Sequence, residues 1–174
     1  VVAYGIIMYV GFIFVGTYMG YAVGSAPVIS YHYGAGNKDE LKNLFKRSLT
    51  IIIVSSVVMT LIAEIIAGYL AGIFVSYDNN LLELTTEAIR IYAVSYLISG
   101  VNIFASSFFT ALNNGVVSAV ISFMRMFVFQ IVMILLLPVV LGISGIWTAV
   151  IAAEVLSVVI SVMFLVKNRK KYSY

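Results

Sequence analysis

The chain has 174 residues, of which 63% are hydrophobic and 10% are charged, with a formal net charge of +3 and a mean hydropathy of +1.11. Soluble domains carry about 25% charged residues, and a domain of this size leaves about 30% of its unfolded surface exposed. This composition therefore excludes a soluble globular protein and predicts an integral membrane protein surrounded by a lipid bilayer. The absence of cysteine excludes disulfide and thiol chemistry.

Five apolar segments predict five membrane-spanning helices. Each is about as long as a bilayer-crossing helix requires, and none alternates like the strands of an outer-membrane barrel. The connections are short, so we expect neighbouring helices to be antiparallel in an all-α, polytopic bundle. The predicted spans are residues 2–29, 49–75, 89–112, 117–141 and 145–166, with a loop at 30–48 and a tail at 167–174.

Basic residues predict the orientation of this bundle. Eight of the ten lie in two clusters that an even number of spans separates, and such clusters usually lie on the cytoplasmic side. We therefore expect the 30–48 loop and the tail to be cytoplasmic. The clusters are Lys38, Lys42, Lys46 and Arg47, and Lys167, Arg169, Lys170 and Lys171.

The sequence opens directly into the first predicted span. Val1 is not an initiator Met, and no signal peptide precedes the apolar segment. We therefore expect this chain to be the C-terminal part of a larger transporter-like protein.

Small residues mark the first span. Gly16, Gly20 and Gly24 recur every four residues, which aligns them on one side of a helix where another backbone can pack closely. The alternative is a hinge, assisted by Pro27, which removes a backbone hydrogen bond near the end of the span. Of the two, the spacing favours helix packing.

A polar stripe follows the third span over nearly five turns. Its members recur at helical spacing, and a stripe of this kind facing lipid would be costly. We expect it to bond between helices, to line a transport pathway, or to do both. The stripe contains Tyr92, Ser95, Tyr96, Ser99, Asn102, Ser106 and Thr110.

Three ionisable residues lie inside predicted spans. Arg125 lies ~12 Å from one edge of the fourth span, and Glu154 lies ~14 Å from the opposite edge of the fifth, at 1.5 Å of rise per residue. We predict that they are neighbours near the midplane, because pairing offsets the cost of placing either charge there. The pair is either structural or involved in coupling protons or substrates. Glu64, nearer the outer half of the second span, is a weaker candidate.

Motifs for chemistry are missing. We find no phosphate-binding glycine loop, no metal-ligand cluster and no nucleophile beside a histidine. We therefore expect no enzyme, no catalytic residue, no metal site, no cofactor and no nucleic acid partner.

One run at the end of the first span is the most characteristic part of the sequence. It reads PVISYHYGAGN from Pro27 to Asn37. It resembles the signature "P-L-I-S-Y-N-Y-G-A-x-N" that ends the eighth helix in the multidrug and toxic compound extrusion (MATE) family. Further segments are similar to later parts of that family in the same order, namely FVSYD at 74–78, FFTAL at 108–112, Arg125 followed by Leu137-Pro138, and GISGIW at 142–147.

The resemblance implies helices eight to twelve of a twelve-helix transporter, mostly its C-terminal bundle, which would pack against a missing N-terminal bundle. It also implies an antiporter in the bacterial cytoplasmic membrane that exports small organic compounds, often cationic, against Na⁺ or H⁺. Some branches of the family carry an acidic cation ligand on helix ten. Residues 89–112 contain no Asp or Glu, so we assign no coupling-ion residue here.

Two other functions stay open. A lipid-linked oligosaccharide flippase of the same superfamily would share the helices but usually needs a strongly cationic cavity, and here only Arg125 lies deep in a span. A non-transport membrane scaffold or channel subunit is the third possibility.

Overall fold

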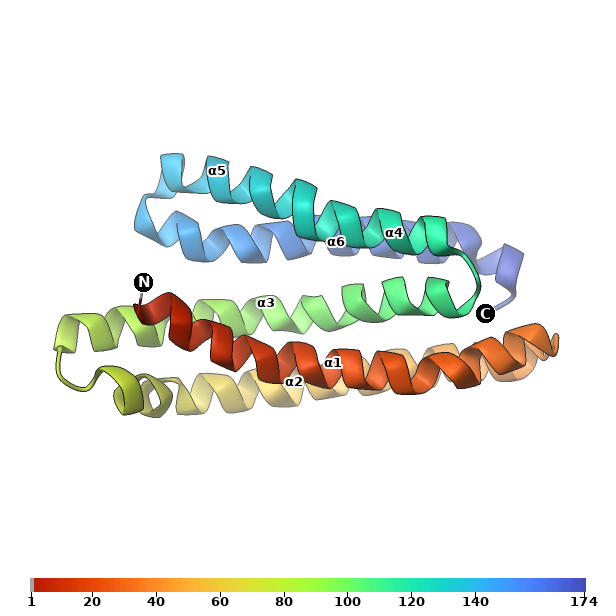
Figure 1. Cartoon of the computed structure of the whole chain (residues 1–174), viewed down its shortest axis with the longest axis horizontal. Coiled ribbons are helices and arrows are strands. Elements are labelled where there is room, and N and C mark those ends of the chain that lie inside the picture. Colours follow the sequence, from red (N-terminus) through yellow and green to blue (C-terminus); the bar gives the residue numbers. More distant parts are fainter. Residues whose placement is uncertain (1) are drawn as a thin grey trace.

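The structure, a computed structural model that describes residues 2–174, consists of long helices joined by short turns (Figure 1). Within these residues five helical segments are long and apolar enough to cross a membrane, as predicted. The fourth is one continuous segment, Gly115–Leu141, that changes from α- to π-helix and back. The helices are α1 (Val2–Gly34), α2 (Lys38–Val75), α3 (Asn79–Ala111), α4 (Gly115–Phe123), the π-helix η1 (Met124–Phe129), α5 (Gln130–Leu141) and α6 (Ile143–Tyr172).

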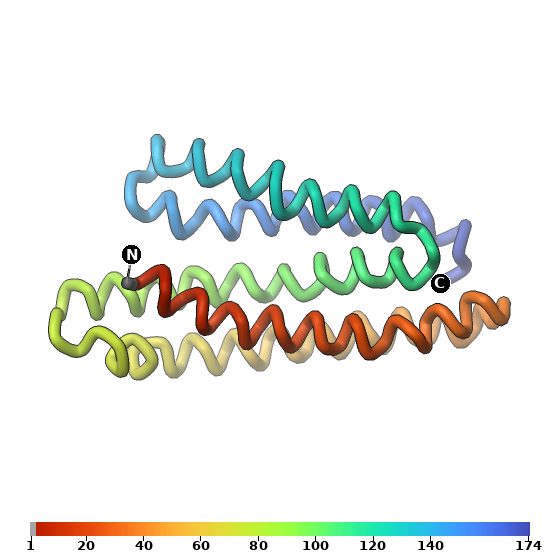
Figure 2. The backbone as a smooth tube through the Cα atoms, in the orientation of Figure 1, coloured from red at the N-terminus to blue at the C-terminus, as the bar shows by residue number. Residues whose placement is uncertain are grey.

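Helix α3 lies at the centre of the bundle. It packs against α1, α2, α4 and α6, and it is the most buried of the five spans. In Figure 1, α1 and α4 lie nearer the viewer, while α2 and α6 lie behind them. The backbone trace in Figure 2 reverses at each connection, so successive spans are antiparallel as predicted. The bundle therefore has two faces, one formed by α1 and α4 and one formed by α2 and α6.

Short polar side chains fix the turns. Asn37, Asp78 and Asn114 precede α2, α3 and α4, and the side-chain oxygen of each accepts a hydrogen bond from a backbone N–H in the first turn. Such N-caps satisfy donors that a helix leaves unpaired. Before α6 the chain turns at Gly142, whose φ of +61° favours glycine.

The segment 30–48, predicted as a loop, is mostly helical. Helix α1 continues to Gly34 and α2 begins at Lys38, so only residues 35–37 form the connection. The prediction was wrong because it placed the ends of the helices at the ends of the apolar segments. Apolar length reflects the thickness of the hydrocarbon layer, whereas a helix can continue beyond that layer into water up to its capping residues. Here the Asn37 cap, with Asp39 and Glu40 in the first turn of α2, favours a helix start well outside the apolar segment.

Close packing in the bundle depends on Gly100 of α3. A Cβ atom at this position would lie 2.9 Å from Ser56 Oγ and 3.1 Å from Tyr18 Cε1. Tyr18 is itself fully buried and donates a hydrogen bond to the Tyr96 carbonyl over 3.0 Å. The glycine therefore lets α1 and α2 both approach the middle of α3.

The predicted packing of Gly16, Gly20 and Gly24 is not found among the described residues. All three are exposed on α1, and a Cβ atom at any of them would meet nothing within 4 Å. Pro27 is likewise exposed, inside α1. Regular spacing identifies a face on which close approach is sterically possible, but it does not identify a neighbour. In this bundle α1 turns its larger residues, such as Phe14 and Tyr18, toward α3 instead.

Candidate functional site

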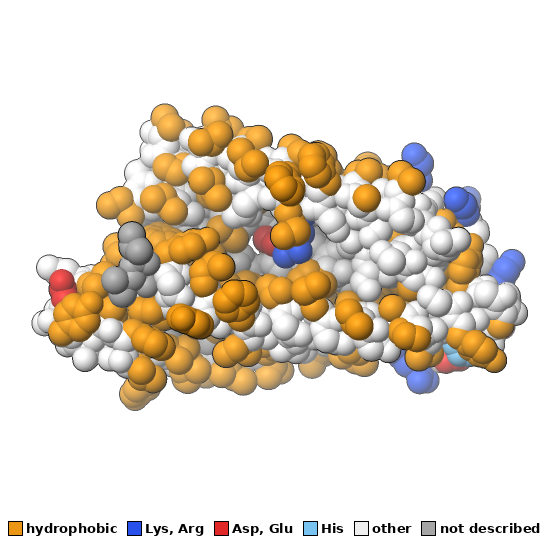
Figure 3. All heavy atoms as spheres, in the orientation of Figure 1, with side chains coloured by type: hydrophobic (Ala, Val, Ile, Leu, Met, Phe, Trp, Pro, Cys, Tyr) orange, Lys and Arg blue, Asp and Glu red, His pale blue; other side chains and the backbone are white. Residues whose placement is uncertain are grey.

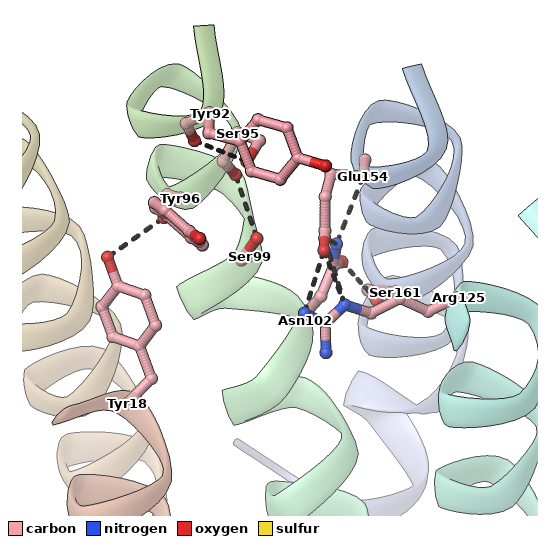
Figure 4. A network of polar contacts seen from close by, with 9 residues as sticks. All are labelled: Tyr18, Tyr92, Ser95, Tyr96, Ser99, Asn102, Arg125, Glu154 and Ser161. Carbon is pink, nitrogen blue, oxygen red and sulfur yellow. Dashed lines mark hydrogen bonds and ion pairs between the residues drawn. The ribbon is translucent and has the colours of Figure 1, made fainter. Parts of the chain in front are cut away.

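Arg125 of η1 and Glu154 of α6 meet inside the bundle, as their predicted depths required (Figure 4). Arg125 Nη2 and Nε each lie 2.9 Å from Glu154 Oε1, and Nε also lies 3.1 Å from Oε2. The Arg125 side chain is 20% exposed and the Glu154 side chain 8%. Opposite charges in such contact neutralise each other within an otherwise apolar part of two spans.

Two further side chains complete this pair. Asn102 of α3 donates from Nδ2 to Glu154 Oε2 over 2.7 Å and to the Glu154 carbonyl over 3.2 Å. Ser161 of α6 donates to Asn102 Oδ1 over 2.9 Å. Both residues are fully buried. We call Asn102, Arg125, Glu154 and Ser161 the midspan network; it connects α3, η1 and α6 through side chains that hold one another in place.

A groove opens beside this network. It has a volume of about 430 Å³ and lies between α1, α3 and the α4–η1 segment. Arg125 and Asn102 contribute to its wall, and Met19, Ala22 and Val23 of α1 face them. Figure 3 shows this face hollowed between α1 and the α4–η1 segment, with basic and acidic side chains at the bottom of the hollow. We call this space the network groove.

Hydroxyl groups continue from the network along the same groove. Ser106 Oγ lies 2.9 Å from Ser118 Oγ and 2.7 Å from Ser122 Oγ, and Thr110 Oγ1 lies 2.7 Å from Ser118 Oγ. These contacts join α3 to α4. Ser106, Thr110 and Ser122 also contribute to the lining of the groove. The second half of the predicted polar stripe therefore both bonds between helices and faces an open space.

The first half of the stripe is arranged differently. Ser95 and Ser99 are fully buried and donate to the carbonyls of Tyr92 and Ser95 in their own helix, over 2.6 Å and 3.0 Å. Tyr92 is half-buried and packs edge-on against Trp147, with 6.0 Å between the ring centroids. None of the three contributes to the network groove. The structure therefore separates them from Asn102 and Ser106.

Glu64 lies apart from the midspan network. Its carboxylate lies 3.7 Å from Nε of Arg90 in α3. The Arg90 side chain is 57% exposed on the bundle and the Glu64 side chain 33%. The contact of Glu64 with Arg90 is longer than those of the Arg125–Glu154 pair. Within residues 2–174 there is no group of three or more His, Cys, Asp or Glu side chains that could hold a metal ion.

Sequence reasoning did not identify Ser161, Ser118 or Ser122. For Ser161 a signal existed, because Glu154, Ser157 and Ser161 recur at spacings of three and four and all three are buried. A polar stripe on the last helix would have predicted that this helix packs against the polar stripe of α3. The π-helix around Arg125 had no such signal. Single π-turns inside α-helices often occur at functional sites, and this one lies at the network.

The sequence profile of the MatE family matches residues 1–136. The chain belongs to the MatE family. Its structure is also similar to the crystal structure of the Vibrio cholerae MATE transporter VcmN in the bent form, with a TM-score of 0.88 and 17% sequence identity. The similarity covers 98% of this chain and 39% of VcmN. A comparison with curated proteins finds no match.

The two similarities cover different parts of this MatE chain. The profile covers α1 to most of α5, including the resembling run at the end of α1. The structural similarity extends to α6, which carries Glu154 and Ser161, but at this identity it supports the fold alone. The midspan network and its groove are therefore described from this chain's own residues.

Proposed function

We propose that this chain forms part of the C-terminal bundle of a secondary active transporter that exports small organic compounds, often cationic, in exchange for Na⁺ or H⁺. We further propose that the network groove lines its substrate pathway. The observation that carries the proposal is a charged, hydrogen-bonded network in the middle of two spans, beside an open groove. Ionisable residues inside membrane spans usually mark substrate or ion pathways.

The arrangement of the pair suggests how substrate charge is selected. Arg125 contributes to the groove wall, whereas Glu154 lies behind it and is less exposed. A cationic compound reaches the carboxylate only when the guanidinium moves away, so it competes with Arg125 for Glu154. A compound with a hydrogen-bond acceptor meets Arg125 directly. Cationic compounds and hydrogen-bond acceptors would therefore interact with different members of the Arg125–Glu154 pair.

Alternating access would follow from the movement of this bundle against a second one. In many secondary transporters the binding site lies near the midplane, between two bundles that rock about it. The exposed glycines of α1 belong to the helix that borders the network groove. Small residues let another backbone approach closely, so this face of α1 suits contact with the N-terminal bundle.

The groove favours this function over a lipid-linked oligosaccharide flippase. A pyrophosphate group requires several unpaired cations, and among the residues that line the network groove the basic side chain is Arg125, which Glu154 already neutralises.

Two methionine variants test the proposal in the intact transporter. Met19 and Met163 are each 52% exposed, but Met19 lines the network groove whereas Met163 lies on α6 outside it. In proteoliposomes, an imposed Na⁺ or proton gradient should drive movement of ethidium, followed by its fluorescence. We expect Met19→Trp to lose most of the rate by filling the groove and Met163→Trp to retain it.

Ethidium movement that an ionophore does not abolish would contradict gradient-driven exchange. Gradient-driven movement that is equal in both variants would keep the transporter but remove this groove from its pathway.

A further inference from the structure

The opposite face of the bundle carries a second groove, between α2, α3 and α6. It has a volume of about 440 Å³ and shares no lining residue with the network groove. This face is formed by the two helices that lie behind α1 and α4 in Figure 1. We call it the rear groove. A ligand bound there would not touch the midspan network.

The rear groove is apolar along its length and basic at one end. On α2 its lining runs from Lys46 to Leu49 and Ile53, and on α6 it runs from Arg169 back to Val162. In each helix the last apolar residue is seven positions from the cation, or about 10 Å of helical rise. The two helices are antiparallel, so they present the same order from the same end of the bundle.

Neither cation is paired with an Asp or Glu side chain. Within residues 2–174 the ion pairs with Asp or Glu are those of Arg90 and Arg125. Lys46 and Arg169 are both exposed, and Arg169 Nε donates to the main-chain oxygen of Tyr174 over 3.3 Å. That bond holds one edge of the guanidinium, which leaves its other donors beside the groove.

The chain beyond α6 builds the wall near the cations. Tyr174 is buried, donates from its hydroxyl to the Leu165 carbonyl over 2.8 Å, and packs against Phe45 and Phe108 with ring centroids 4.6 Å and 4.8 Å away. Burial raises the pKa of the Tyr174 phenol above its ordinary value. The Tyr174 side chain is therefore held in place and uncharged, so it does not compete with an anion for the two basic groups.

We infer that the rear groove binds one anionic phospholipid, with its phosphate between Lys46 and Arg169 and an acyl chain along the apolar lining. Basic pockets between membrane helices suit anionic lipid head groups, and apolar side chains outside the bundle interior suit an acyl chain. A free phosphate ion would use the cations but not the lining. The inference does not depend on the proposed transport function.

The test measures lipid binding to the intact transporter by native mass spectrometry. The protein in neutral detergent is titrated with dioleoylphosphatidylglycerol, with dioleoylphosphatidylcholine as the neutral lipid of equal chain length. We expect Lys46→Gln with Arg169→Gln to weaken the first phosphatidylglycerol by about 30-fold, at ~1 kcal/mol for each basic side chain. Binding of phosphatidylcholine should change little.

A matched pair of charge variants controls for the general basicity of this end. Lys42→Gln with Lys170→Gln removes the same charge from α2 and α6, and neither residue lines the groove. We expect less than about a threefold change, because charges outside the groove act on the phosphate only through water, where two charges interact weakly. Equal losses of phosphatidylglycerol affinity in the two double variants would overturn the inference and indicate diffuse electrostatic attraction instead. No loss of affinity in Lys46→Gln with Arg169→Gln would also overturn it.

Apolar variants test the groove without changing charge. Val162→Trp fills the lining, whereas Val159→Trp places the same residue on an exposed position of α6 outside it. The first should weaken phosphatidylglycerol binding and the second should not; this pair decides the question if the charge variants fail to fold. Displacement of the lipid by millimolar inorganic phosphate, or equal effects of the two tryptophans, would contradict an acyl chain in the groove.

Discussion

The two halves of the polar stripe on α3 have the same spacing but different structures. In the first half, Ser95 and Ser99 are buried and bond to carbonyls of their own helix. In the second half, Asn102 bonds to α6, and Ser106 bonds to α4 beside an open groove. One periodic pattern thus contains a purely packed region and a candidate functional region.

The chemistry of the side chains explains the difference. A serine hydroxyl can donate to the carbonyl three or four residues earlier, so a buried serine needs no other helix. A buried asparagine has two N–H donors and a carbonyl oxygen to satisfy, and Asn102 finds these partners on Glu154 and Ser161. Spacing therefore predicts which residues share one side of the helix, whereas the residue type indicates where partners from other helices are required.

The largest effect should come from breaking the ion pair of the second half. Glu154→Leu leaves the Arg125 charge without its partner, and we expect a loss of about 3 kcal/mol in the free energy of unfolding. Removing both charges, as Arg125→Leu with Glu154→Leu, should recover most of this loss, because uncharged residues of similar size need no partner. Unfolding of the intact transporter by denaturant in detergent measures both.

Measuring transport in the same variants distinguishes a role of the pair in function from a role in stability. We expect the double variant to be folded yet to have lost gradient-driven ethidium movement. If the stability losses of Glu154→Leu and of the single variant Arg125→Leu add up to the loss of the double variant, the two residues do not act as a pair. A stable double variant with the wild-type rate would make the pair structural only.

A smaller effect should distinguish the two halves directly. Asn102→Leu removes the hydrogen bonds to Glu154 and Ser161, and we expect it to cost ~1–2 kcal/mol, as membrane hydrogen-bond networks do. It should also change which compounds the intact transporter exports, measured as resistance profiles at matched expression. The control is Ser99→Ala, which removes an intrahelical bond away from the groove. Equal resistance profiles for Asn102→Leu and Ser99→Ala would show that the two halves of the stripe do not differ in function.

Much of this structure follows from the sequence. Apolar length predicted five antiparallel spans, and counting residues from the span edges predicted that Arg125 and Glu154 are neighbours. These predictions rest on the bilayer, whose thickness fixes span length and makes an isolated charge costly. The same constraint could not predict that α2 begins at Lys38, because the bilayer does not limit a helix in water.

Other features depend on contacts that no local pattern encodes. The spacing of Gly16, Gly20 and Gly24 is typical of packed helices, yet Gly100, with no such pattern around it, is where α1 and α2 approach α3. The π-helix at Arg125 likewise has no marker in its residue types. Which face meets a neighbour is decided by the whole bundle.

The smallest effect should come from the hydroxyl cluster between Ser106 and Ser122, whose Oγ atoms lie 2.7 Å apart. Hydrogen bonds of this kind between membrane helices average ~0.6 kcal/mol. A double-mutant cycle with Ser106→Ala and Ser122→Ala in the intact transporter should therefore give a coupling energy of that order. The cycle with Ser95→Ala and Ser122→Ala should give none, because Ser95 bonds within α3. A coupling as large for Ser95 as for Ser106 would mean that the first half of the stripe also reaches α4, and the division of α3 into two halves would fail.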